Sequence, residues 1–196
     1  MRIVLTDFMS LDGVVQGPGG EEEDTEGGFR HGGWSGPYFD PEIMGTEISD
    51  GMDGADALLF GRRTYTTMAA AWPNRPDDPF ADRMNSIRKY VVSRTLSEAD
   101  LTWNNSVLIP GEGAMAAIDN LRGEPGGDVL VWGSSKLATQ LVSAGLIDEY
   151  RLMVEPVLLG GGKRIFPEDG ERRPLKLVSA KTASTGTLVC TFRPAG

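Results

Sequence analysis

The sequence predicts a three-layer α/β/α fold with a central, mostly parallel mixed sheet and a C-terminal antiparallel hairpin. Short apolar runs alternate with amphipathic segments over residues 2–144, a pattern typical of a parallel sheet covered by helices on both faces. Two alternating segments, 175–182 and 187–192, flank Gly186 and predict the hairpin. With 196 residues the chain is long enough for one full core, and we expect a single domain over residues 1–196.

A strand, a tight turn and a helix follow one another in the second half of the chain. The apolar run 128–132 indicates a buried strand, Gly133 begins the turn, and Leu137 and Leu141 recur at helical spacing before Gly145. The first N–H groups of a helix lack partners within it, and the helix dipole adds positive charge there. This turn would therefore attract an anion such as a pyrophosphate. An ordinary capped helix without a ligand is the alternative.

A second strand leads into a turn with two arginines. Strand 55–60 is followed by Gly61, Arg62, Arg63 and Thr64 at the start of a helix, where cations oppose the helix dipole. This mismatch suggests an anion between the arginines. Surface arginines with the threonine as a helix cap would explain the same pattern.

A third strand, 89–92, ends in Ser93 and Arg94. In sheets of this kind, ligands bind beyond the carboxyl ends of the strands. We therefore expect the polar side chains of all three junctions to gather at one edge of the sheet: Arg62, Arg63, Ser93, Arg94, Ser134, Ser135 and Lys136.

The remaining elements are predicted from shorter patterns. We expect a first strand at 2–9 with a turn at 10–13, a helix from Pro41 capped by Asp40, a helix at 80–88, a strand at 106–109, a helix at 113–121, a strand at 147–159 and a flexible basic loop at 160–166.

Residues 17–40 form a long segment rich in glycine and proline, which predicts a functional lid or a disordered loop. We interpret its acidic run at 21–24 as a solvated loop tip. Trp34 and Tyr38 fit no helix or strand pattern. These aromatic side chains either cover an edge of the core or stack on a flat substrate ring.

Charge and composition exclude several classes of function. A formal net charge of −9 repels polyanions, so we expect no nucleic acid and no anionic membrane as a partner. The single cysteine, Cys190, is expected in the core. With one histidine, His31, the chain lacks the ligands of a thiolate zinc cluster and of most other metal or triad sites. No apolar segment approaches the ~20 residues that span a bilayer, and we expect a cytoplasmic protein without a metal.

Six short motifs occur in an order and spacing that are specific together. They are 10–13 (SLDG), 59–65 (LFGRRTY), 92–94 (VSR), 131–135 (VWGSS), 145–149 (GLIDE) and 156–162 (PVLLGGG). In these motifs the chain resembles the dihydrofolate reductase-like proteins, which include the reductase domain of the bifunctional riboflavin-biosynthesis deaminase-reductase. The resemblance covers nearly all of the chain. One histidine and one cysteine cannot supply the zinc site of the deaminase half. The resemblance therefore implies a stand-alone reductase domain.

The resemblance implies that the three turns bind NADPH. It assigns to the cofactor Gly61, Arg62, Arg63 and Thr64 of one turn, Ser93 and Arg94 of another, and Gly133, Ser134, Ser135 and Lys136 of the third. The arginines and Ser93 would hold the 2′-phosphate side, and Thr64 the pyrophosphate. Guanidinium groups suit bidentate phosphate contacts and favour NADPH over NADH. A homodimer is also expected from the resemblance.

The implied function is an NADPH-dependent reductase. It would transfer a hydride to a C=N or C=O bond of a small pterin-like or ribosylaminopyrimidine-like heterocycle, as dihydrofolate reductase and 5-amino-6-(5-phosphoribosylamino)uracil reductase do. Asp12 and Glu47 are the candidates to orient the substrate or relay a proton, with Glu42 next. The alternative is that Asp12 holds a turn with Gly13 and that both glutamates are solvated.

The candidate substrate-binding residues are two aromatic and two basic side chains. Trp34 and Tyr38 could stack on the ring, and Lys163 and Arg164 could meet a substrate phosphate or remain solvated. A non-catalytic NADP(H)-binding regulatory protein is the competing function, and a flavin-binding protein of the same fold is a third.

Overall fold

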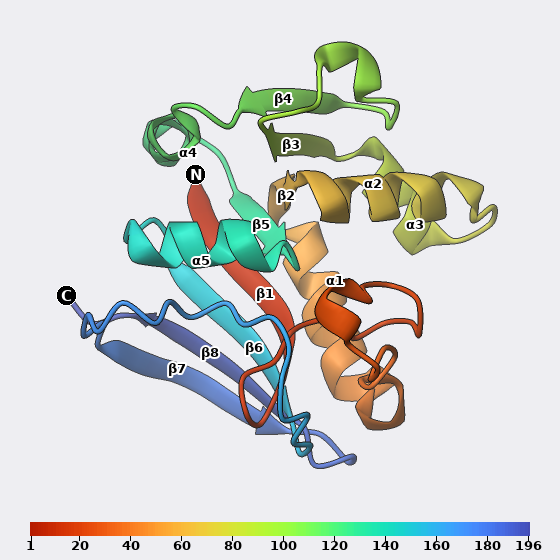
Figure 1. Cartoon of the computed structure of the whole chain (residues 1–196), viewed down its shortest axis with the longest axis vertical. Helices are drawn as coiled ribbons and strands as arrows, with labels where there is room; N and C mark the ends of the chain where they lie inside the picture. Colours follow the sequence, from red (N-terminus) through yellow and green to blue (C-terminus); the bar gives the residue numbers. More distant parts are fainter.

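An eight-stranded sheet forms the centre of the molecule (Figure 1). The computed structural model describes residues 1–196. Its strands are β1 (Arg2–Ser10), β2 (Ala55–Gly61), β3 (Arg88–Ser93), β4 (Ser106–Pro110), β5 (Asp128–Trp132), β6 (Glu149–Glu155), β7 (Leu175–Thr182) and β8 (Leu188–Pro194). They lie in the order β4-β3-β2-β5-β1-β6-β8-β7. The first six are parallel, and β8 and β7 continue the sheet in antiparallel pairing, which confirms the predicted fold class.

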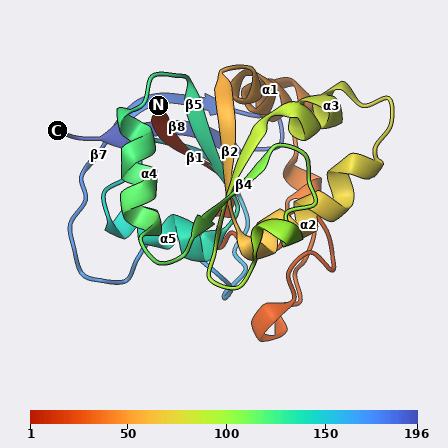
Figure 2. The same ribbon diagram turned by 90° about the horizontal axis from the view of Figure 1, so that it is seen from above.

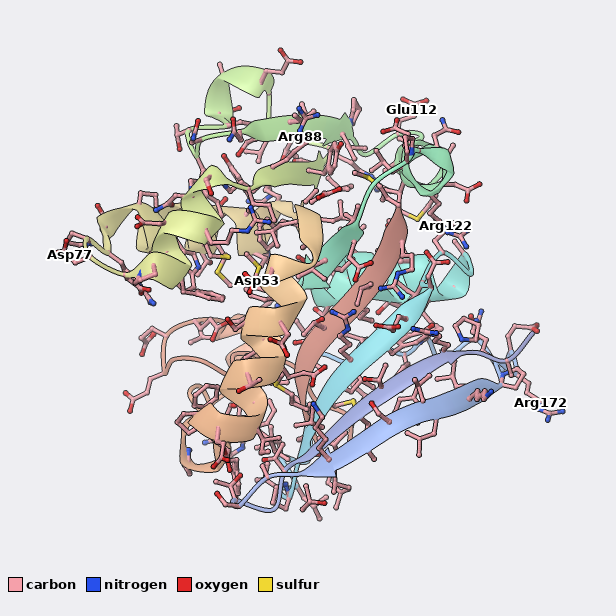
Figure 3. The ribbon with its side chains drawn as sticks, turned by 180° about the vertical axis from the view of Figure 1, so that it is seen from behind. Asp53, Asp77, Arg88, Glu112, Arg122 and Arg172 are labelled. Atoms are coloured by element: carbon pink, nitrogen blue, oxygen red, sulfur yellow. The ribbon has the colours of Figure 1, made fainter.

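Helices cover both faces of this sheet. They are α1 (Thr46–Asp53), α2 (Arg62–Ala71), α3 (Pro79–Ser86), α4 (Ala114–Gly123) and α5 (Ser135–Ser143). Figures 2 and 3 show α4 and α5 on one face and α1 and α3 on the other. Leu5 of β1 faces the α5 side and packs in the larger core cluster, whereas its neighbour Val4 packs in the second cluster with Phe60. This alternation follows from the two-residue period of a strand.

Strand β6 is shorter than the predicted strand at 147–159, so that prediction is wrong in extent. Before the strand, Asp148 lies in a bend and bonds β1 partly through its side chain: its backbone N–H donates to the Ile3 carbonyl at 2.9 Å, and its carboxylate accepts from the Ile3 N–H at 2.8 Å. After it, Pro156 lacks the N–H that would continue the ladder. The predicted helix at 80–88 also ends earlier, at Ser86, because strand β3 already begins at Arg88.

The long segment 17–40 is folded rather than extended. It contains two 3₁₀ turns, Glu26–Gly28 and Gly36–Tyr38, and leads into a π-helical turn at Pro41–Gly45. The Asp40 carboxylate accepts from two backbone N–H groups of that turn, which confirms the predicted cap.

The sheet opens beside the carboxyl end of β1. This strand pairs with β5 only as far as Thr6, whereas it pairs with β6 as far as Ser10. One edge of β1 is therefore unpaired beyond Thr6, next to the turn that follows β5. None of the helices is both long and apolar enough to cross a membrane.

Candidate functional site

A cleft of about 1450 Å³ lies at the carboxyl edge of the parallel strands. All ten side chains or glycines predicted to bind the cofactor line it: Gly61, Arg62, Arg63, Thr64, Ser93, Arg94, Gly133, Ser134, Ser135 and Lys136. The three turns therefore meet at one site, as expected for the carboxyl ends of neighbouring parallel strands.

Two hydroxyl groups fasten the turn after β2 to the turn after β5. The Ser134 Oγ accepts a hydrogen bond from the Gly61 N–H at 2.9 Å, and the Ser134 N–H donates to the Thr64 Oγ1 at 3.0 Å. These bonds hold the N-termini of α2 and α5 side by side. The unpaired N–H groups at the start of both helices thus lie at the same part of the cleft.

The turn after β5 has an uncommon backbone. Gly133 and Ser134 both adopt left-handed conformations, with φ of 53° and 55°. Such a φ disfavours side chains with a Cβ, and most of all β-branched ones. The glycine therefore makes this reversal possible, and the serine tolerates its own strain because its N–H and hydroxyl are both bonded.

The cations of the cleft fall into two groups. Arg62 and Arg94 are exposed, and neither takes part in an ion pair. Arg63, Lys136 and Lys163 instead surround the carboxylate of one residue, Glu26, with the Lys163 ammonium at 2.6 Å. The first pair is thus free for a phosphate, while the second group already holds an anion.

The acidic part of the loop lies over the cleft. Glu22, Glu23 and Asp24 line it, and Asp24 pairs with Lys163. Our interpretation of this run as a solvated tip is therefore incomplete, because the basic side chains below attract it. Hydrogen bonds from Arg63 and Lys163 lower the pKa of the neighbouring Glu26 to about 2, so this carboxylate is charged at neutral pH.

If the cleft binds NADPH, as the resemblance implies, Glu26→Gln should bind it about fivefold more tightly than the wild type. The carboxylate would compete with phosphate oxygens for the same cations, and exposed ion pairs of this kind contribute modest energies. Fluorescence titration of both proteins measures the change. Glu22→Gln is the matched control, since this glutamate also lines the cleft without an ion pair; weaker binding by the Glu26 variant would contradict the competition.

The half of the cleft toward α1 is apolar. It is lined by Phe8, Phe39, Ile48, Phe80, Trp132 and Met153. Two polar atoms here are buried without a partner, the Thr6 Oγ1 and the Trp132 Nε1. Since buried polar groups are normally hydrogen-bonded, this half suits a flat ligand that carries polar atoms at its edge.

The two predicted catalytic carboxylates do not line the cleft. The Asp12 carboxylate accepts from the Ser10 hydroxyl and from the N–H groups of Leu159 and Gly160, and these bonds lower its pKa to about 2. Glu47 pairs with Lys181 of β7 at 2.9 Å. The residues of this helical segment that do line the cleft, Gly45 and Ile48, carry no ionisable group.

The four predicted substrate-binding residues are divided. Lys163 lines the cleft, whereas Arg164, Trp34 and Tyr38 do not. Trp34 is 8% exposed and its Nε1 donates to the Gln16 carbonyl at 2.8 Å. Of the two roles left open for this tryptophan, the structure shows the packing role.

Three polar residues in or beside the cleft, Asp7, Ser35 and Glu155, were missed in the sequence. Asp7 lines it from β1 with one carboxylate oxygen unpartnered, and burial raises its pKa well above the usual range. Ser35 lines the apolar half and donates to the buried Glu155. For Asp7 the available signal was a carboxylate in the mostly apolar first strand, whereas the strand that ends in Glu155 also contains Glu149 and Arg151 and gave no such signal. Ser35, in the irregular segment, had none.

Comparison with known proteins identifies the family of the chain. The sequence profile described as the RibD C-terminal domain matches residues 2–189. The YyaP protein of Bacillus subtilis (strain 168) is 31% identical over 192 residues, which cover 95% of this chain and 92% of YyaP.

Solved structures share the fold at lower identity. A Shewanella sp. PV-4 protein named for riboflavin biosynthesis superposes with a TM-score of 0.76 at 20% identity, over 100% of both chains. Dihydrofolate reductase from Enterococcus faecalis, in complex with NADP(H) and a compound named RAB-propyl, gives a TM-score of 0.60 at 15% identity, over 100% of this chain and 97% of the reductase. With a family profile that spans almost all of its length, the chain belongs to the RibD C-terminal domain family.

Proposed function

We propose that the protein is an NADPH-dependent reductase of a small heterocycle. The observation that carries this proposal is the pair of exposed, unpaired guanidinium groups, Arg62 and Arg94, beside two helix N-termini in one cleft. Family membership and the NADP(H) complex of the dihydrofolate reductase with the same fold support it.

The chemistry of the cleft fits the cofactor. Arg62 and Arg94, with Ser93, would hold the 2′-phosphate by charge-assisted hydrogen bonds. Backbone N–H groups at the start of α2 and α5 would hold the pyrophosphate. The unpaired edge of β1 beyond Thr6 offers backbone groups to the nicotinamide amide. When bound, the nicotinamide supplies a hydride.

The apolar half of the cleft would hold the substrate. Phe8 and Phe39 can contact the faces of a flat ring, and the unpartnered Thr6 Oγ1 and Trp132 Nε1 can bond polar atoms at its edge. These features favour a pterin-like or ribosylaminopyrimidine-like heterocycle with a C=N or C=O bond. Lys163, which lines the cleft, would meet a substrate phosphate once Asp24 and Glu26 release it.

Oxidation of NADPH in the presence of candidate acceptors tests the proposal. The purified protein is incubated with NADPH and either dihydrofolate or a ribosylaminopyrimidine, and the loss of NADPH absorbance is followed. We expect acceptor-dependent oxidation. Tight binding of NADPH without oxidation by any acceptor would instead support the non-catalytic regulatory function, which the lack of an ionisable group on the cleft side of α1 favours. A yellow protein as purified would indicate a flavin.

We also propose a homodimer that forms through edge strand β7. This strand exposes Leu177 and Val178, at 52% and 47%, beside unpaired backbone groups, and a second copy could cover both. Light scattering should give a dimer for the wild type and a monomer for Leu177→Lys. Leu158→Lys, at a loop position that is 71% exposed, should remain a dimer; a monomeric wild type would contradict the proposal.

A further inference from the structure

A buried carboxyl group lies behind the apolar half of the cleft. Glu155, the last residue of β6, is 0% exposed. It follows Met153 on the same face of the strand, and Met153 lines the cleft. One of its oxygens, Oε2, has no hydrogen-bond partner. A buried acid without a cation beside it is costly to ionise, and the strand gives no structural reason for it.

Ser35 connects this carboxyl group to the cleft. Its side chain is buried but lines the cleft, and its Oγ is 2.6 Å from the Glu155 Oε1. Ser35 is itself held in place, because its backbone N–H donates to the Pro18 carbonyl at 3.2 Å. A hydroxyl can donate or accept. With ionised Glu155 it donates to the carboxylate, whereas with protonated Glu155 it can accept and turn its own hydrogen toward the cleft.

The surroundings keep this carboxyl group isolated from other charges. The ionisable residues of the segments packed on this face are engaged elsewhere: Asp12 bonds residues 159 and 160, Asp40 bonds Ser184, and Glu47 pairs with Lys181. Glu42 is exposed. Burial therefore dominates and raises the pKa of Glu155 to about 7, against a smaller opposing effect of the Ser35 hydroxyl.

We propose that Ser35 and Glu155 form a proton relay into the substrate half of the cleft. The inference rests on the proposed reductase function. As a hydride ion adds to the carbon of the C=N or C=O bond, the π electrons move to its nitrogen or oxygen. That atom takes the hydroxyl proton of Ser35, and Ser35 takes the proton of Glu155. The carboxylate left behind recovers a proton from water. Ser35 is the catalytic residue that touches the substrate, and Glu155 acts through it.

Two measurements test the relay, and the first does not depend on turnover. Infrared difference spectra between the wild type and Glu155→Gln, recorded from pH 5 to pH 9, report the carbonyl stretch of a protonated carboxyl group. We expect this band at pH 5 and its loss with a midpoint near pH 7, because the group is buried. Absence of the band at pH 5 would overturn the relay.

The second measurement is kcat for NADPH oxidation with dihydrofolate or the ribosylaminopyrimidine as the acceptor. In the wild type, kcat should fall above about pH 7, where Glu155 loses its proton. Glu155→Gln and Ser35→Ala should each lower kcat about 100-fold and abolish this dependence, and the double variant should be no slower than either. Glu149→Gln is the matched control: it is a buried glutamate on the same strand, paired with arginines, and should keep the wild-type pH profile.

The outcomes separate the relay from the function on which it rests. Equal kcat and pH profile in the wild type and Glu155→Gln would overturn the relay alone. A wild type that binds NADPH and reduces no acceptor would overturn the reductase function and the relay with it.

Discussion

Replacing both Arg62 and Arg94 by alanine should weaken NADPH binding at least 100-fold and leave NADH binding unchanged. Both guanidinium groups line the cleft without a carboxylate partner, so their charge is available to the 2′-phosphate. Hydrogen bonds to charged groups contribute about 1.5–3 kcal/mol each, and two of them account for a 100-fold change. Calorimetric titration with each dinucleotide measures both affinities.

Arg88→Ala provides the matched control. This exposed arginine, labelled in Figure 3, is the first residue of β3, and Ser93 and Arg94 lie at the opposite end of the same strand, in the cleft. Its removal changes the net charge without touching the site, so the affinity for NADPH should stay within twofold. An equal loss of affinity for NADPH and for NADH in the double variant would show that the arginines do not bind the 2′-phosphate.

Gly133→Val should weaken NADPH binding about 100-fold and lower the melting temperature by a few degrees. A β-branched residue at a φ of 53° is strained, at a cost of about 1–2 kcal/mol. Relief of that strain would move Ser134 and break its bonds to Gly61 and Thr64. The helix N–H groups that face the pyrophosphate would then be misaligned, and two such charge-assisted bonds account for the lost affinity.

Gly123→Val separates this effect from the general consequence of a larger side chain. Gly123 ends α4 with an ordinary φ, and a Cβ there would meet no atom within 4 Å. We expect wild-type affinity from this variant in the same titration. If Gly133→Val also bound NADPH normally, the turn after β5 would not be part of the cofactor site.

The fold could be predicted from the sequence because each junction carries a local signal. An apolar run followed by a glycine predicts both a strand and the point where it ends. This pattern occurs at 128–132 before Gly133 and at 55–60 before Gly61. The exact end of β6 was missed because apolar residues continue through Val157–Leu159 after Pro156. Residues 157–159 form a loop that is held by a hydrogen bond from the Leu11 N–H to the Val157 carbonyl. Hydrophobic periodicity alone does not distinguish such a loop from a strand.

The candidate site was predictable only in the half that the three turns line. There the residues are adjacent in sequence, so a turn such as 61–64 places them together. The apolar half joins Phe8, Ser35 and Ile48 from three distant segments, and no local pattern links them. Long-range pairing of β1 with β6 brings Glu155 behind the cleft, where Ser35 bonds it.

The central claim is that three turns at the sheet edge form a site for one NADPH. Calorimetric titration of the unmodified protein with NADPH and then with NADH tests this claim most directly. We predict one NADPH per chain and an affinity at least tenfold higher than that for NADH, because the 2′-phosphate meets two unpaired arginines. No binding of NADPH, or equal affinity for both dinucleotides, would contradict it.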